Sequence, residues 1–123
     1  MAPRVLIVDD AVFMRNTLKE IFTSQQFEIA GEAANGVEAV EKYKETTPDL
    51  MTMDIVMPFK NGIQATRDIL AQDPEATIVI CSALGQESLV TEAIEAGATD
   101  FIVKPFRSEN VMQVVQKALA NKG

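Results

Sequence analysis

VLIVDD, residues 5–10, is a run of four apolar residues that ends in two adjacent acids. A strand without polar alternation is typical of a parallel sheet that helices cover on both faces. An amphipathic segment, residues 11–24, follows it, with Leu18 and Phe22 on the apolar face and Arg15 on the opposite face. We therefore expect a buried strand, an acidic strand end and a covering helix at the start of the chain.

The same unit of strand and helix recurs along the chain. Pro48 and Pro74 end two of the predicted helices, and Gly97 suits the left-handed position after a third. The further predicted strands cover residues 27–33, 50–53, 77–81 and 100–103, and the further predicted helices cover residues 37–46, 63–70, 86–96 and 111–119. Because parallel strands are joined by right-handed crossovers, this alternation predicts an α/β fold, a doubly wound five-stranded parallel sheet between two layers of helices.

The composition of the 123 residues narrows the possible functions. The length suits one domain, residues 1–123, and a formal net charge of −7 opposes binding to nucleic acid or to an anionic membrane. The chain has no His, which excludes imidazole bases, imidazole metal ligands and Ser/His/Asp or Cys/His catalytic sites. The single cysteine, Cys81, cannot form an internal disulfide, and no segment is typical of a signal peptide or a membrane span. We therefore expect a cytoplasmic protein whose chemistry rests on carboxylates, Lys and hydroxyl groups.

Polar side chains follow four of the five predicted strands. Asp9 and Asp10 follow the first strand, Asp54 the third, Ser82 the fourth and Lys104 the fifth. Each has an ordinary explanation when it is taken alone, such as a helix cap for Asp10 or a loop acid for Asp54. The corresponding explanations for Ser82 and Lys104 are a turn residue and a solvated charge. Ligands of doubly wound sheets bind outside the carboxyl ends of the strands, so we expect these side chains to form one site.

Three carboxylates in one site repel one another, so we expect a cation to neutralise them. Without imidazole ligands the available donors are oxygens, which favour Mg²⁺ over zinc. Lys104 and Ser82 would then face a phosphoryl group and neutralise the charge that develops on its oxygens during transfer. Asp54, on the central strand, is the candidate nucleophile, and it would form an aspartyl phosphate.

Several short motifs surround these residues: VLIVDD at 5–10, MDIVMP at 53–58, NG at 61–62, CSA at 81–83 and KPF at 104–106. Together they resemble the receiver domain of two-component response regulators over essentially the entire chain. The longer stretches RVLIVDDAVFMR, TMDIVMP and DFIVKPF are similar to single-domain chemotaxis regulators of the CheY type. The resemblance implies a flavodoxin-like (βα)5 fold with strand order 2-1-3-4-5, and a stand-alone receiver without an output domain.

The resemblance also assigns roles to the acidic site. Asp54 would accept a phosphoryl group from the phosphohistidine of a sensor histidine kinase. Asp9, Asp10 and Asp54 would hold Mg²⁺, for which Mn²⁺ is a possible substitute, and the backbone carbonyl of Val56 would supply a further ligand. Lys104 would pair with the phosphoryl oxygens.

The resemblance also implies a conformational switch, and the chain differs from some relatives at positions near the site. The hydroxyl of Ser82 would move toward the phosphate, and Phe101, which stands where the family often has Tyr, would turn into the space that the hydroxyl leaves. The peptide bond before Pro105 is expected to be cis. Val56 and Leu84 are apolar where some relatives carry polar groups that affect water attack, so we expect slow self-dephosphorylation.

The implied function is a monomeric regulator of chemotaxis or motility rather than a conventional enzyme, because it would catalyse only its own phosphorylation and dephosphorylation. Its partners would be the sensor kinase, a target such as a flagellar motor switch or another motility protein, and a phosphatase. A phosphorelay intermediate and an unphosphorylated scaffold, or pseudo-receiver, remain alternatives. A small Mg²⁺-dependent phosphatase of the haloacid dehalogenase type is disfavoured because it needs a second acid where Val56 stands. A flavin-binding module is disfavoured because the first loop, DDAVF, is no hydroxyl-rich phosphate cradle.

Overall fold

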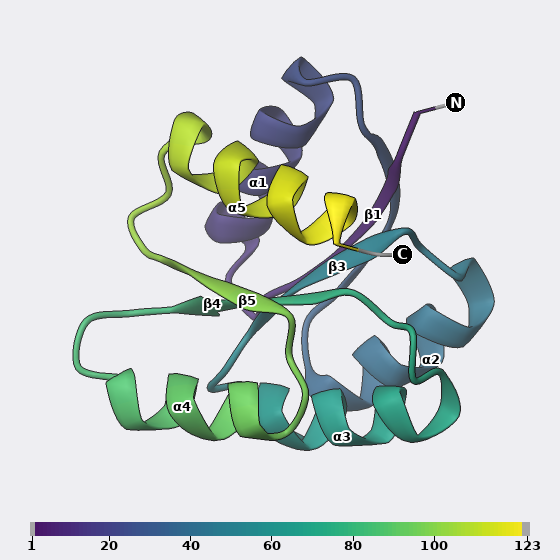
Figure 1. The fold of residues 1–123 in the computed structure, drawn as a ribbon, viewed down its shortest axis with the longest axis vertical. Helices are drawn as coiled ribbons and strands as arrows, with labels where there is room; N and C mark the ends of the chain where they lie inside the picture. Colours follow the sequence, from purple (N-terminus) through teal and green to yellow (C-terminus); the bar gives the residue numbers. More distant parts are fainter. Residues whose placement is uncertain (1, 122–123) are drawn as a thin grey trace.

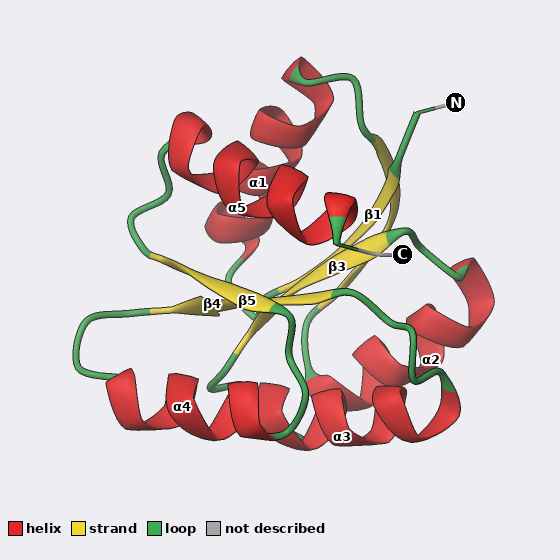
Figure 2. Cartoon of the chain, viewed as in Figure 1, coloured by secondary structure: helices red, strands yellow, loops and turns green. Residues whose placement is uncertain are grey.

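A five-stranded parallel sheet lies between two layers of helices in the computed structural model, which describes residues 2–121 (Figures 1 and 2). The strands are β1 (Arg4–Val8), β2 (Glu28–Ala33), β3 (Leu50–Asp54), β4 (Ile78–Ser82) and β5 (Asp100–Val103). The helices are α1 (Val12–Ser24), α2 (Gly36–Thr46), α3 (Gly62–Gln72), α4 (Glu87–Glu95) and α5 (Ser108–Ala120). The strand order is β2-β1-β3-β4-β5 and all neighbours run parallel, so the predicted α/β architecture and strand order are confirmed. Met1, Lys122 and Gly123 of the predicted domain lie outside the described residues.

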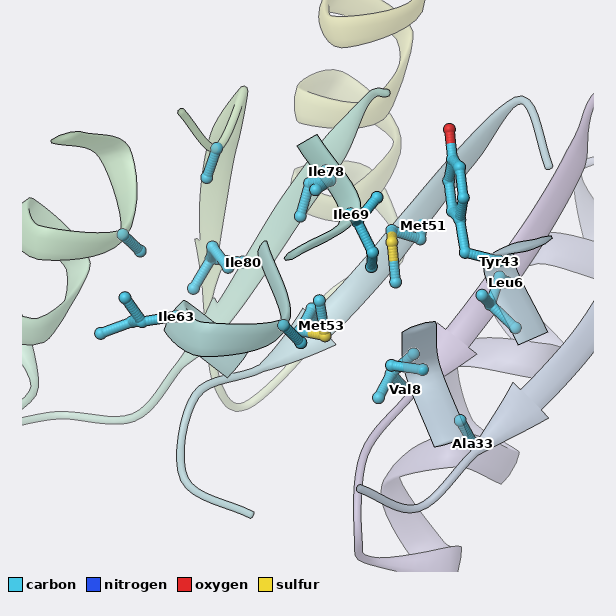
Figure 3. Packing of buried hydrophobic residues seen from close by; sticks show 14 of the residues in the cluster. Leu6, Val8, Ala33, Tyr43, Met51, Met53, Ile63, Ile69, Ile78 and Ile80 are labelled. Atoms are coloured by element: carbon cyan, nitrogen blue, oxygen red, sulfur yellow. The ribbon is translucent and has the colours of Figure 1, made fainter. Parts of the chain in front are cut away.

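Both faces of the sheet are buried at its central strands, β1, β3 and β4, as the uninterrupted apolar run of β1 predicts. Figure 1 shows α1 and α5 on one face and α2, α3 and α4 on the other. Alternate residues of β1 point to opposite layers: Leu6 and Val8 pack in the core beneath α2, α3 and α4, and Val5 and Ile7 pack beneath α1 and α5. Figure 3 shows the first of these cores. Each fully buried aliphatic side chain contributes about 1.5–3 kcal/mol, so the sheet is a firm support for the loops at its edge.

The helix boundaries lie within two residues of the predicted ones, except at the start of α5. Helix α3 begins at Gly62, after a capping box in which the side chain of Asn61 accepts from the amide of Gln64 and the side chain of Gln64 accepts from the amide of Asn61. Helix α5 begins at Ser108, three residues before the predicted start, because its first turn is polar and exposed and so lacks an apolar signal. Gly97 has a φ of +114°, as predicted for the position after α4. None of the helices in the described part of the chain combines the length and apolarity that a bilayer-spanning helix needs.

Candidate functional site

Three carboxylates meet at the carboxyl edge of the sheet. Asp54 is the last residue of β3, and Asp9 and Asp10 follow β1 directly. Strands β1 and β3 are neighbours, and one carboxylate oxygen from each of the three acids lies within 4.8 Å of the others. Asp9 and Asp54 are buried, whereas Asp10 is exposed. The predicted grouping of the acids is therefore confirmed.

The ammonium of Lys104 contacts the two buried acids. Its Nζ lies 3.3 Å from Oδ1 of Asp54, to which it donates a hydrogen bond, and 3.2 Å from Oδ2 of Asp9. Two backbone amides also donate to the buried acids: the amide of Ala11 to Oδ1 of Asp9 at 2.9 Å, and the amide of Ile55 to Oδ1 of Asp54 at 3.0 Å. One ammonium thus contacts two of the three acids, and the group keeps an excess of negative charge when the acids are ionised.

Burial and neighbouring charges shift the proton affinities of the site. Burial, followed by the charge of Asp9, raises the pKa of Asp54 from 3.8 to about 6, although Lys104 and the amide of Ile55 act in the opposite direction. Burial alone would lower the pKa of Lys104, but the nearby charges of Asp54 and Asp9 and the hydrogen bond with Asp54 outweigh burial, so this pKa lies above its ordinary value. At neutral pH the site therefore contains an ammonium beside a mostly ionised Asp54.

The donor set fits a hard divalent cation. Oδ2 of Asp9 is buried and makes no hydrogen bond, because the nearby ammonium of Lys104 lies outside hydrogen-bonding geometry. The charge of Lys104 lies 3.2 Å from this oxygen, but its hydrogen-bonding capacity is unused, and two further acids lie beside it. Oxygen donors of this kind suit Mg²⁺, which needs only one or two protein carboxylates and otherwise binds water or substrate oxygens.

A pocket of about 480 Å³ lies between β5, α4 and the loop that leads into α4. Ser82, the buried last residue of β4, and Phe101 of β5 both line it, although they come from different strands. Phe101 is 41% exposed, so its ring is directed at least partly to solvent. Leu84 also lines the pocket and is exposed, and Val56 is exposed in the loop after β3. The structure therefore places both predicted switch residues and Leu84 around one pocket, whereas Val56 lies two residues beyond Asp54 and does not line it.

Three further residues test the sequence interpretation. Asp10 does not cap α1, because the N-cap position is Ala11 and no side chain caps that helix end. The Lys104–Pro105 peptide bond is cis, in agreement with the prediction. Cys81 is buried, and burial, followed by the charges of Asp54 and Asp9, raises the pKa of its thiol. The thiol is therefore a core group and not a reactive one.

Two contributors to the site were not predicted. Gly62 donates its amide to the carbonyl of Ile55 at 2.7 Å and closes the loop that follows Asp54. The Asn61-Gly62 pair signals a turn in the sequence, but nothing in it signals such a close approach. Arg15, expected on the solvent side of its helix, has a side chain that is only 15% exposed and that donates to the carbonyl of Asp9. No sequence pattern marks a hydrogen bond to a backbone carbonyl.

The metal-free protein is expected to become more stable as the pH falls from 7 to 5. The pKa of Asp54 is about 6 in the folded protein and ordinarily 3.8, so the folded state binds this proton more tightly than the unfolded state. The resulting stabilisation is complete below the ordinary pKa of 3.8 and is lost as the pH rises through the pKa in the folded protein, about 6. We expect the free energy of unfolding to rise by about 1 kcal/mol over this range, measured by urea unfolding at each pH.

Asp54→Asn is the control for this pH dependence, because it removes the titrating group and should remove the rise. Saturating Mg²⁺ should suppress the rise in the parent protein, since the cation replaces the proton as the neutralising charge. A hydrogen bond from Lys19 lowers the pKa of Glu32 in spite of burial, so this group acts in the opposite sense and at lower pH. Parallel pH profiles for the parent and the variant would contradict the prediction.

Comparisons with known proteins agree with this geometry. Residues 5–116 match the model of the response regulator receiver domain. The chain is 59% identical to the chemotaxis protein CheY of Thermotoga maritima over 95% of this chain and 98% of that protein. It is 55% identical to CheY of Bacillus subtilis, over 97% and 99% of the two chains. The solved CheX–CheY–BeF3–Mg²⁺ complex from Borrelia burgdorferi is similar with a TM-score of 0.88 and 45% identity, over 93% of this chain and 87% of that one.

Proposed function

The chain belongs to the response regulator receiver domain family, and on that premise we propose that it is a switch driven by phosphorylation of Asp54. CheY-type receivers are signalling proteins rather than conventional enzymes. The observation that carries the proposal is the group of three acids within 4.8 Å, with the ammonium of Lys104 against two of them. Such a group supplies a nucleophile, a cation site and a fixed positive charge, which are the requirements of phosphoryl transfer.

In the proposed reaction, a carboxylate oxygen of Asp54 attacks the phosphorus of a phosphohistidine on a sensor histidine kinase. A new oxygen–phosphorus bond forms and the nitrogen–phosphorus bond breaks, and the histidine nitrogen leaves with the bonding electrons and takes up a proton. Lys104 pairs with the phosphoryl oxygens. Asp9, Asp10 and Asp54, with the carbonyl of Val56, would hold Mg²⁺ or Mn²⁺, and a bound cation neutralises charge on the acids and on the phosphoryl group.

The pocket between α4 and β5 supports the proposed output. Ser82 and Phe101 line the same pocket of about 480 Å³, so a movement of the hydroxyl toward Asp54 changes the space that is open to the aromatic ring. An inward turn of Phe101 would reshape the exposed surface of α4 and β5, which a partner then recognises.

The proposed partners are a sensor kinase, a motility protein such as a flagellar motor switch, and a phosphatase. The related CheY of Borrelia burgdorferi forms a complex with CheX, BeF3 and Mg²⁺, which supports a protein partner and a cation for this site as well. Relatives of matching length support the proposal of a single, stand-alone receiver. The proposed oligomeric state is a monomer. The proposed location is the cytoplasm, because the protein would meet its kinase and its target there.

Incubation with a small-molecule phosphodonor tests the reaction without a kinase. We expect the intact mass to increase by one phosphoryl group per chain in the presence of Mg²⁺ or Mn²⁺, and not in the presence of a chelator. The cation is required because three acids and an incoming phosphoryl group repel one another. A folded protein that binds Mg²⁺ and gains no phosphoryl group would favour the scaffold alternative.

Val56→Asn and Leu84→Glu are expected to shorten the life of the phosphorylated protein. Val56 is 59% exposed and Leu84 is 85% exposed, so polar side chains there cost little packing and can hold a water beside the phosphoryl group. We expect self-dephosphorylation to become roughly tenfold faster in the double variant, measured as decay of the phosphorylated mass. Val56→Ala and Leu84→Ala are the controls, because they shorten the apolar side chains without adding a polar group. Equal decay in the parent and the polar variant would contradict the prediction.

A further inference from the structure

The backbone carbonyl of Asp9 is hydrogen-bonded to a charged side chain. Nη1 of Arg15 donates to this carbonyl at 2.6 Å, from one turn into α1. The same carbonyl belongs to the peptide plane that joins Asp9 to Asp10, because the peptide unit is planar. The torsion angles on either side of this plane, ψ of Asp9 and φ of Asp10, help to set how the two acids lie relative to each other. The contact therefore acts on the relative placement of two proposed metal ligands.

Arg15 is itself fixed by the neighbouring strand. Its Nε donates to Oε1 of Glu32 at 3.0 Å, and Oε2 of Glu32 accepts from Nζ of Lys19 at 2.9 Å. Glu32 lies on β2 opposite Ile7 of β1, so the carboxylate comes from the strand next to the one that ends at the site. The guanidinium thus bridges β2 and the loop after β1 with two hydrogen bonds at once, which the planar fork of Arg permits.

The other polar atoms of Asp9 are also held, with one exception. Its amide donates to the carbonyl of Ala33 at 3.1 Å, and its Oδ1 accepts from the amide of Ala11 at 2.9 Å. Its carbonyl accepts from Arg15, and Oδ2, which faces the site, is buried without a hydrogen bond. Three hydrogen bonds therefore fix the orientation of Asp9, and its remaining oxygen, Oδ2, faces the site.

We propose that Arg15 is a positioning residue for the Mg²⁺ site, which holds the Asp9 carbonyl and is anchored by Glu32. The inference rests on the proposed function only in that the three acids bind Mg²⁺. A side chain that orients a ligand from outside the site, without touching the metal, characteristically changes metal affinity about 10- to 100-fold when it is removed. Arg15 meets this description because its contact is to the backbone of a ligand and not to a carboxylate of the site.

The test compares two variants that change the net charge equally. Arg15→Met removes the contact with the Asp9 carbonyl and keeps an unbranched apolar stem, whereas Lys19→Met removes only the second cation on Glu32. We expect Mg²⁺ affinity, measured by isothermal titration calorimetry, to fall about tenfold in Arg15→Met and less than about twofold in Lys19→Met. In the metal-free proteins, the amide NMR signals of Asp10 and Ala11 should shift in Arg15→Met and stay in place in Lys19→Met.

Two further measurements keep the inference testable. If Arg15→Met does not fold, Arg15→Lys takes its place, because one nitrogen does not reproduce the two separate donors, Nε and Nη1, that reach Glu32 and the Asp9 carbonyl, and this variant should give a smaller loss of affinity. Equal Mg²⁺ affinity in the two charge-matched variants would overturn the inference, and so would a parent protein that does not bind Mg²⁺. A parent that binds Mg²⁺ but gains no phosphoryl group would overturn the proposed phosphorylation alone and leave the role of Arg15 standing.

Discussion

Asp54→Asn is expected to abolish phosphoryl gain while it makes the metal-free protein more stable at neutral pH. The amide that replaces the carboxylate is a poor nucleophile, so we expect incorporation from a small-molecule donor to fall by at least about a thousandfold. The same substitution removes a buried charge whose pKa is raised to about 6 by burial and by Asp9, so unfolding should need more urea. Intact mass and urea unfolding of the same sample measure the two effects.

Two control variants test whether Asp54, and not another residue, accepts the phosphoryl group. Asp49→Asn changes an acid immediately before β3, at the opposite end of the same strand, and should leave phosphoryl gain unchanged. Ser82→Ala removes the hydroxyl at the end of β4, the strand next to the one that ends at Asp54, and this variant should still gain the group. Phosphoryl gain that persists in Asp54→Asn and disappears in Ser82→Ala would move the acceptor to the hydroxyl and refute the assignment.

A gain in stability on loss of the acceptor has a physical basis in the site. Acids that lie this close repel one another, which costs stability in the folded state unless a cation or a proton neutralises them. Natural sites of this kind carry such a cost, and the rest of the fold must offset it. In this chain the offset comes from the sheet, whose strands β1, β3 and β4 are almost completely buried on both faces.

The sequence predicts side chains at the site better than it predicts backbone contacts. Apolar runs in the sequence locate the ends of the strands, and the strand ends of a parallel sheet share an edge. The sequence therefore predicts a single site for Asp9, Asp10, Asp54 and Lys104. The sequence did not reveal the bond from Arg15 to the Asp9 carbonyl, because helical periodicity assigns a polar residue to the solvent face and carries no information on backbone acceptors.

The interpretation of Asp10 shows the same limit. As an acid between a strand and a helix it suits an N-cap, yet the helix begins one residue too late for that role, at Val12 after Ala11. The loop conformation decides the position, and it is fixed by hydrogen bonds of Asp9 to Ala33 and Ala11. These are contacts that only the assembled strands provide. Local pattern therefore predicted the residue and left its role open.

Gly62→Ala is expected to be among the most damaging small substitutions in the chain, although Ala is the better helix former. Gly62 is the first residue of α3, where Ala would gain at most about 1 kcal/mol in helix propensity. A Cβ at this position would lie 2.1 Å from the carbonyl oxygen of Asp54, a backbone atom that no side-chain rotation can move away. The overpacking should outweigh propensity and cost about 3 kcal/mol or more in the free energy of unfolding.

The same clash links stability to chemistry, because relief of it must move the backbone of Asp54, the proposed phosphoryl acceptor. A displacement near 1 Å in a reacting group costs about a hundredfold in rate, so the folded fraction of Gly62→Ala should be phosphorylated far more slowly than the parent. Gly31→Ala is the matched control: its Cβ would meet Leu6 and Thr46 at 3.5 and 3.7 Å, which is ordinary contact, so both properties should change little. If the two variants have equal unfolding free energies and equal phosphorylation rates, the close approach of Gly62 to Asp54 does not position the acceptor.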